Sequence, residues 1–236
     1  MSVDLIVFAP HPDDAELHIG ASIARECRRG KTVVVVDCSR GEQASRGTPE
    51  LRQEEALAAA HCLGIQERRN LQLPDGGISP YDPRQLQAVV SVLRHYRPHT
   101  ILAMHDHARH PDHRACAELV RRACKTAAIH GYTDCDQAAH RSQRLLFYEA
   151  ELPLVGRPIL SQCEEVDVAA KNAALACYKS QWGETNTHAP ATSIAEPAFL
   201  RWIEHRGRTW GYQAQCDYAE ALITEECWAI AALFNN

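Results

Sequence analysis

The sequence predicts an α/β protein in which helices flank a mainly parallel β-sheet. Short apolar runs rich in Val and Ile alternate with longer runs of helical periodicity, which is the order of parallel strands joined by crossover helices. The chain has 236 residues, 45% of them hydrophobic, and can therefore bury one substantial core. We expect a single domain that spans residues 1–236.

The first strand and helix have clear boundaries. Residues 3–8 form an apolar run that predicts a buried strand. A helix is predicted over residues 14–29, because Gly30 follows it and glycine commonly ends helices. The β-branched run at residues 32–38 then predicts a second strand.

The same alternation continues toward the C-terminus. A helix is predicted over residues 48–63, because Pro49 suits a first helical turn and Gly64 suits a helix end. Further predicted strands cover residues 69–73, 99–105 and 144–148. Further predicted helices cover residues 83–97, 114–129, 166–181 and 197–212.

Composition excludes several classes of partner. The formal net charge of -5 gives no basic field for nucleic acid. No apolar run approaches the roughly 18 residues of a membrane span, and the N-terminal run lacks a signal-peptide cleavage site. The ten cysteines form no CxxC pair and are expected to be free thiols. We therefore expect a cytoplasmic protein that binds a small molecule or further copies of itself.

A polar segment follows the first predicted strand. Residues 9–16 read APHPDDAE, so an imidazole and several carboxylates stand where a buried strand should meet solvent. His11 and Asp14 are ligand types of catalytic zinc, and Asp13 between them could act as a base. The alternative is that Asp13 or Asp14 only caps the next helix.

A histidine-rich segment follows the predicted strand at residues 99–105. Residues 105–113 read HDHARHPDH, and ligands bind beyond the carboxyl ends of parallel strands, so the two polar segments can face each other. His110 and His113 lie three residues apart, which allows one to bind a metal and leaves the other free for proton transfer. Zinc lowers the pKa of bound water to about 7, which suits hydrolysis of an amide or ester.

These two segments together resemble the PIG-L or LmbE-like family of zinc-dependent N-acetylglucosamine deacetylases. The resemblance continues through SRGTPELRQEEA, NLQLPDGG and CYKSQW and covers most of the chain. Among the branches of the family, the chain most resembles the one that deacetylates N-acetylglucosaminyl-malate in bacillithiol biosynthesis. The resemblance implies a Rossmann-like domain, a metal site at the carboxyl ends of the strands, an N-acetyl sugar conjugate as substrate, and a homo-oligomer.

The resemblance also implies roles for individual residues. It places the metal on His11, Asp14 and His113. It makes Asp13 the general base, and it assigns His110 to the oxyanion or the leaving amine, with Asp112 orienting that imidazole. The ion implied is Zn²⁺, although Fe²⁺ or another divalent ion could occupy the same ligands.

Three residues are candidates for substrate binding. Arg52 either reaches the substrate or pairs with Glu55 at helical spacing. Arg109 either binds a malate carboxylate or is an ordinary surface arginine. Asp75 either accepts sugar hydroxyls or belongs to a Pro-Asp-Gly turn, which is the interpretation we favour. One position departs from this branch, because His18 stands where its members commonly carry glycine.

Two other functions fit parts of the sequence. A deacylase of another N-acetyl sugar or of a natural-product intermediate would keep the same chemistry. A nucleotide- or sugar-binding module without hydrolytic activity would keep only the fold. No GxGxxG pattern follows the first predicted strand, so the binding module has no support from a phosphate-binding motif.

Overall fold

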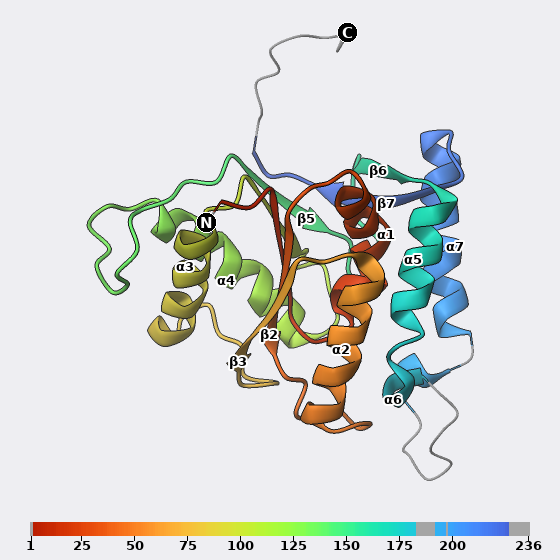
Figure 1. Cartoon of the computed structure of the whole chain (residues 1–236), viewed down its shortest axis with the longest axis horizontal. Coiled ribbons are helices and arrows are strands. Elements are labelled where there is room, and N and C mark those ends of the chain that lie inside the picture. The colour runs from red at the N-terminus through yellow and green to blue at the C-terminus, as the bar shows by residue number, and fades with distance from the viewer. Residues whose placement is uncertain (1, 183–191, 197, 227–236) are drawn as a thin grey trace, which may run out of the picture.

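The computed structural model describes residues 2–182, 192–196 and 198–226. The strands are β1 (Leu5–Ala9), β2 (Val33–Ser39), β3 (Glu67–Leu73), β4 (Thr100–Met104), β5 (Arg144–Tyr148), β6 (Ile159–Cys163) and β7 (Tyr218–Ile223). The helices are α1 (Asp14–Arg28), α2 (Pro49–Leu63), α3 (Pro83–Tyr96), α4 (Pro111–Ala127), α5 (Glu165–Leu175), α6 (Lys179–Trp182) and α7 (Phe199–Ala214), with a 3₁₀ turn at Ser193–Ala195. The predicted α/β class is confirmed (Figure 1).

The described strands form one sheet in the order β3-β2-β1-β4-β5-β7-β6. β1 is central and pairs in parallel with both β2 and β4, so that Leu5 lies opposite Val33 on one side and Thr100 on the other. β7 pairs antiparallel with β5 and β6. Because the strand order reverses between β1 and β4, their carboxyl ends flank the crevice where such sheets bind ligands.

Both faces of the central strands are buried, which explains their continuous apolar runs. Successive strand residues point to opposite faces, so Ile6 and Phe8 pack with residues of α3 and α4. Val7 and Ala9 pack with residues of α1, α2 and α5. The two groups of helices accordingly lie on opposite sides of the sheet (Figure 1).

The C-terminal third differs from the predicted elements. The helix predicted over residues 166–181 is interrupted, because α5 ends at Leu175 and α6 begins only at Lys179. Between them Tyr178 is fully buried in the core, with its ring centroid 5.6 Å from that of Trp182. The helix predicted over residues 197–212 corresponds to α7, and residue 197 lies outside the described residues. Strands β6 and β7 were not predicted.

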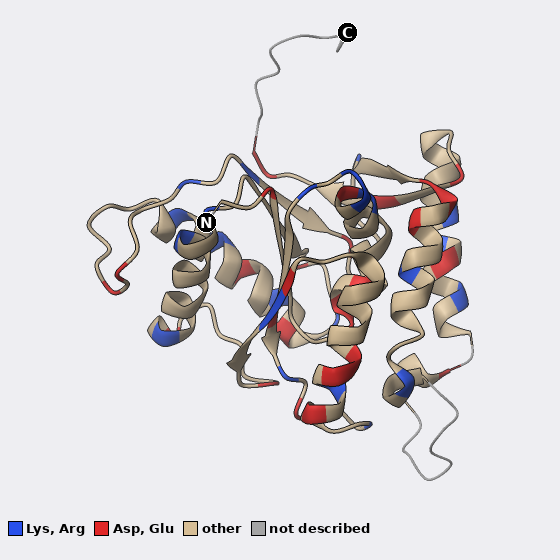
Figure 2. Cartoon of the chain, in the orientation of Figure 1, with Lys and Arg blue, Asp and Glu red and all other residues tan. Residues whose placement is uncertain are grey.

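Nine cysteines lie in the described part of the chain and all are free, whereas Cys227 lies outside it. No helix among the described residues is both long and apolar enough to cross a membrane. The first turn of α5 carries Glu165 and Asp167, with Lys171 further along the helix, whereas α7 carries three arginines and one glutamate (Figure 2).

Candidate active site

The link between β1 and α1 has a strained backbone. Asp13 precedes α1 with a φ of 107°, which is uncommon for a residue with a side chain. Its carboxylate makes no capping hydrogen bond. The Asp14 carboxylate instead accepts a hydrogen bond of 3.0 Å from the backbone N–H of His11. These acids therefore do not serve as simple helix caps, and their positions require another explanation.

Asp14 lies between two imidazoles. Its Oδ2 is 3.2 Å from Nδ1 of His11 and 3.3 Å from Nε2 of His113. His113 belongs to the first turn of α4, so the segments that follow β1 and β4 meet at the carboxyl edge of the sheet. His110 adds a further nitrogen, because ring nitrogens of His11, His110 and His113 lie within 4.8 Å of one another. Imidazole nitrogens with a carboxylate oxygen are the donors of catalytic zinc sites.

Electrostatics favour a cation at this point. Burial alone would lower the pKa of His113, but Asp14 and Glu151 outweigh burial and raise that pKa to about 9. Burial is likewise outweighed at His11, whose pKa rises well above its ordinary value because of Asp112 and other nearby carboxylates. A metal ion would replace the protons that these imidazoles otherwise hold. The donor set and its charge therefore fit a divalent ion.

The second ring nitrogen of His11 also faces carboxylates. Nε2 lies 3.2 Å from Oδ1 of Asp75 and 3.3 Å from Oδ2 of Asp112. Asp75 lies in the expected turn, which is closed by a hydrogen bond from the Gly77 N–H to the Pro74 carbonyl. A carboxylate on the outer nitrogen of an imidazole orients the ring and makes it a better metal ligand. Asp75 is thus both a turn residue and part of the site.

Arg52 contacts Asp13 and not Glu55. Its Nη2 lies 3.0 Å from Oδ2 of Asp13 and also donates to the carbonyl of Pro12. Glu55 instead accepts hydrogen bonds from Ser180. The expected pairing of Arg52 with Glu55 is therefore wrong, whereas its role in substrate binding stays a prediction. Burial raises the pKa of Asp13 to about 7, although Arg52 acts in the opposite direction.

The relation between His110 and Asp112 also differs from the expectation. His110 precedes α4, and its Nδ1 accepts a hydrogen bond of 3.2 Å from the backbone N–H of Asp112. The carboxylate of Asp112 points elsewhere, toward His11 and the backbone N–H groups of Gly76 and Ile78. The expectation that this carboxylate orients His110 is therefore wrong. Since Nδ1 accepts, a neutral His110 carries its proton on Nε2.

Comparison with known proteins identifies the family of the chain. The family model described as "PIG-L: GlcNAc-PI de-N-acetylase" matches residues 6–124, which include the polar segments at residues 9–16 and 105–113. The chain belongs to the PIG-L family. The resemblance found in the sequence motifs is thereby confirmed, and the family description is that of a deacetylase.

Individual relatives of this PIG-L chain include bacterial proteins. It is 27% identical, over 90% of its length and 99% of the relative, to the probable N-acetyl-alpha-D-glucosaminyl L-malate deacetylase 2 of Bacillus subtilis. The structure of conserved protein TT1542 from Thermus thermophilus matches with a TM-score of 0.87 and 31% identity, covering 99% of this chain and all of that one. The structure of GalB, the 4-carboxy-2-hydroxymuconate hydratase of Pseudomonas putida, matches with a TM-score of 0.72 and 22% identity. The match covers 99% of this chain and all of that one.

The motifs of this PIG-L chain gave no sign of Glu151. Its Oε1 lies 2.8 Å from Nδ1 of His113, and its Oε2 accepts a hydrogen bond from the backbone N–H of Arg109. The one available signal was its place just after a predicted strand, at the edge of the sheet that carries the site. Arg109 itself is exposed, and its side chain forms no ion pair within the described residues.

His18, the position that departs from the related branch, is buried and faces α7. Its Nδ1 lies 2.8 Å from Nη2 of Arg206. Burial and the charge of Arg206 hold the pKa of His18 well below its ordinary value. The imidazole is therefore neutral, and it accepts this hydrogen bond from the guanidinium.

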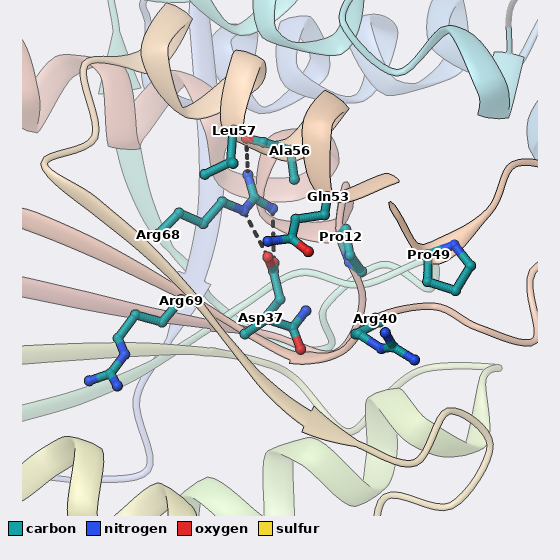
Figure 3. A pocket seen from close by; sticks show the side chains of 10 residues that line it. Pro12, Asp37, Arg40, Pro49, Gln53, Ala56, Leu57, Arg68 and Arg69 are labelled. Carbon is teal, nitrogen blue, oxygen red and sulfur yellow. Dashed lines mark hydrogen bonds and ion pairs between the residues drawn. The ribbon is translucent and has the colours of Figure 1, made fainter. Parts of the chain in front are cut away.

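A cavity is lined by Pro12, Asp37 and Arg68 among others, and no group of potential metal ligands among the described residues lines it. Arg68 of β3 forms two hydrogen bonds of 2.8 Å with the carboxylate of Asp37 on β2 (Figure 3). The same guanidinium pairs with Glu16 on α1. These buried ion pairs join two strands to the helix that begins at the site, which is a structural role.

Proposed function

We propose that this protein is a metal-dependent hydrolase that removes the acetyl group from an N-acetylglucosamine conjugate. The observation that carries the proposal is the position of Asp14 between two imidazoles, with the carboxylate of Asp13 beside it. The family description and the Bacillus subtilis relative support this reaction. The hydratase of similar fold does not oppose it, because a likeness at 22% identity concerns the fold alone.

The proposed ligands of the metal are His11, Asp14 and His113. A bound zinc ion would polarise the acetyl carbonyl and lower the pKa of a water molecule. Ferrous iron also fits nitrogen and oxygen donors of this kind. Asp75, Asp112 and Glu151 are placed to orient the two imidazoles through their outer nitrogens.

Asp13 is the proposed general base. A base is most effective when its pKa lies near the working pH, and burial raises the pKa of Asp13 to about 7. Arg52 holds the carboxylate through Oδ2, so the other oxygen is available to accept a proton from the attacking water. As the carbon–nitrogen bond breaks, the departing nitrogen takes up one proton, either this one or that of His110, which gives acetate and a free amine.

His110 is the proposed proton donor to the substrate. Its Nδ1 is occupied by the Asp112 N–H, which leaves the N–H of Nε2 for the substrate. Such a donor stabilises the negative charge that develops on the acetyl oxygen, or it protonates the leaving amine. Residues that follow two different strands would thus act on one amide.

The substrate that we favour is N-acetylglucosaminyl-malate. The support is the relative from Bacillus subtilis, together with the exposed guanidinium of Arg109 next to His110 in the sequence. An arginine is suited to bind a malate carboxylate through paired hydrogen bonds. Another N-acetyl sugar conjugate, without the malate group, is the second candidate.

The test is to incubate the purified, zinc-loaded protein with N-acetylglucosaminyl-malate, free N-acetylglucosamine and diacetylchitobiose, and to measure the acetate and amine released. We expect release from the malate conjugate with the highest kcat/KM. Equal rates on all three would contradict the malate assignment and leave the deacetylase. No release from any of them, in a protein that binds zinc, would contradict the deacetylase itself.

A further inference from the structure

The imidazole of His113 lies between two carboxylates. Its Nε2 faces Asp14, and its Nδ1 lies 2.8 Å from Oε1 of Glu151. The imidazole is buried, and the side chain of Glu151 is 30% exposed. Within the described residues no hydrogen bond of aligned geometry reaches this Nδ1, so the ion pair with Glu151 is the contact that holds the outer side of the ring.

Glu151 lies in a loop after β5 that α7 anchors. The carboxylate of Glu149, which is only 2% exposed, accepts a hydrogen bond of 2.9 Å from Nε1 of Trp210. Arg206, one turn earlier on α7, lies 3.3 Å from the same carboxylate and donates to the carbonyl of Ala150 at 2.6 Å. The two residues that precede Glu151 are therefore fixed by one helix.

Arg206 also contacts the helix that carries Asp14. Its Nη2 donates to Nδ1 of His18, which lies one turn after Asp14 on α1. One guanidinium thus joins α1 to the loop that carries Glu151. Because Asp14 and Glu151 face the two nitrogens of His113, Arg206 links the supports on both sides of that ring.

From these contacts we infer that Glu151 is a positioning residue that holds His113 toward the metal, and that α7 sets its place through Arg206 and Trp210. A carboxylate on the outer nitrogen fixes the orientation of an imidazole ligand and increases its basicity. Loss of such a partner weakens metal binding by roughly 10–100-fold. The inference rests on the metal centre of the proposed function.

Zinc affinity, measured without substrate by competition with a chromophoric chelator, tests the first part. Glu151→Ala should bind Zn²⁺ roughly 10–100-fold more weakly than the unaltered protein. Glu151→Gln should fall between the two, because the amide keeps an oxygen near Nδ1 but carries no charge. The control is Glu54→Ala, which removes an exposed carboxylate on α2 and should leave the affinity unchanged.

A double-mutant cycle tests the part played by α7. Arg206→Met should weaken zinc binding although Arg206 contacts no proposed ligand atom, and its effect should be smaller in the Glu151→Ala background, where only its contact with His18 remains to be lost. The visible absorption of the cobalt-loaded protein should change in both single variants, whereas circular dichroism of the metal-free variants reports whether they fold.

Each outcome bears on a different statement. If folded Glu151→Ala binds zinc as tightly as the unaltered protein, the positioning role is wrong. If the effects of Glu151→Ala and Arg206→Met simply add, the role of α7 is wrong. If the unaltered protein binds no divalent ion, the proposed function fails, and this result is distinct from the other two.

Discussion

At the scale of single residues, neighbouring acids differ because their partners differ. Burial alone would raise the pKa of both Asp13 and Asp14. At Asp14 the charges of His113 and His11 outweigh burial, and its pKa lies well below the ordinary value. At Asp13 Arg52 only partly offsets burial, and the pKa is raised to about 7. Environments that separate the pKa values of adjacent carboxylates are typical of sites that need both a ligand and a base.

The sequence predicted this pair of acids but not the groups that separate them. Asp13 and Asp14 lie in one short motif, so spacing alone brings them to the site. Arg52, by contrast, reaches Asp13 from α2, and Glu151 reaches His113 from the loop after β5. Contacts of this kind depend on how the helices and loops pack, which a local pattern does not contain.

Asp13→Asn tests whether Asp13 acts as the base while Asp14 binds the metal. We expect kcat to fall by roughly 100- to 10,000-fold, the usual contribution of a general base, because an amide cannot take the proton of the attacking water. The zinc content measured by atomic absorption should stay at that of the unaltered protein. Asp136→Asn, in an exposed loop, should leave both quantities unchanged. An Asp13→Asn protein with full turnover would refute the base.

At the scale of elements, the sequence predicted the parallel half of the sheet better than the antiparallel half. β1, β2 and β4 are buried on both faces and read as apolar runs. β7 reads YAEALI, which is rich in residues that favour helices, and only its pairing with β5 and β6 makes it a strand. The break between α5 and α6 also comes from tertiary packing. Burial of Tyr178 overrides a local sequence that favours helix.

A buried ion pair joins these less predictable elements to α1. Nζ of Lys171 on α5 lies 2.7 Å from Oε1 of Glu220 on β7, and each side chain is 3% exposed. The Glu220 carboxylate also accepts hydrogen bonds from the backbone N–H groups of Ala21 and Ser22 on α1. The pair therefore holds α5, β7 and α1 against one another.

Removing one member of this pair should be costly. Lys171→Met leaves Glu220 charged and buried without a counter-ion, which we expect to lower the free energy of unfolding by about 3–5 kcal/mol. The matched control is Arg208→Met, which breaks the exposed pair between α7 and Glu165 and should cost about 1 kcal/mol or less. Urea unfolding measures both. Equal losses in the two variants would show that the buried pair contributes no more than the exposed one.

At the scale of the whole molecule, the site connects segments that are far apart in the sequence. The carboxyl ends of β1 and β4 meet because the strand order reverses between them. The sequence predicted that the polar segments after these two strands can face each other. His11 follows β1, His113 lies at the start of α4, and Asp75 and Glu151 come from loops after β3 and β5. A metal held here would act as a cross-link between these segments in the folded chain only.

Zinc should therefore stabilise the entire fold. A ligand that binds only the native state at 100 times its Kd adds about 2.7 kcal/mol, which for a chain of this size corresponds to a rise in Tm of roughly 5–11 °C over the chelator-treated protein. His113→Ala should abolish most of the rise, because it removes a ligand, whereas His61→Ala, which changes an exposed histidine on α2, should retain it. Differential scanning calorimetry measures all three proteins with and without zinc. If the rise persists in His113→Ala at the same zinc concentration, the ion binds elsewhere, and the cluster around Asp14 is not the centre that joins these segments.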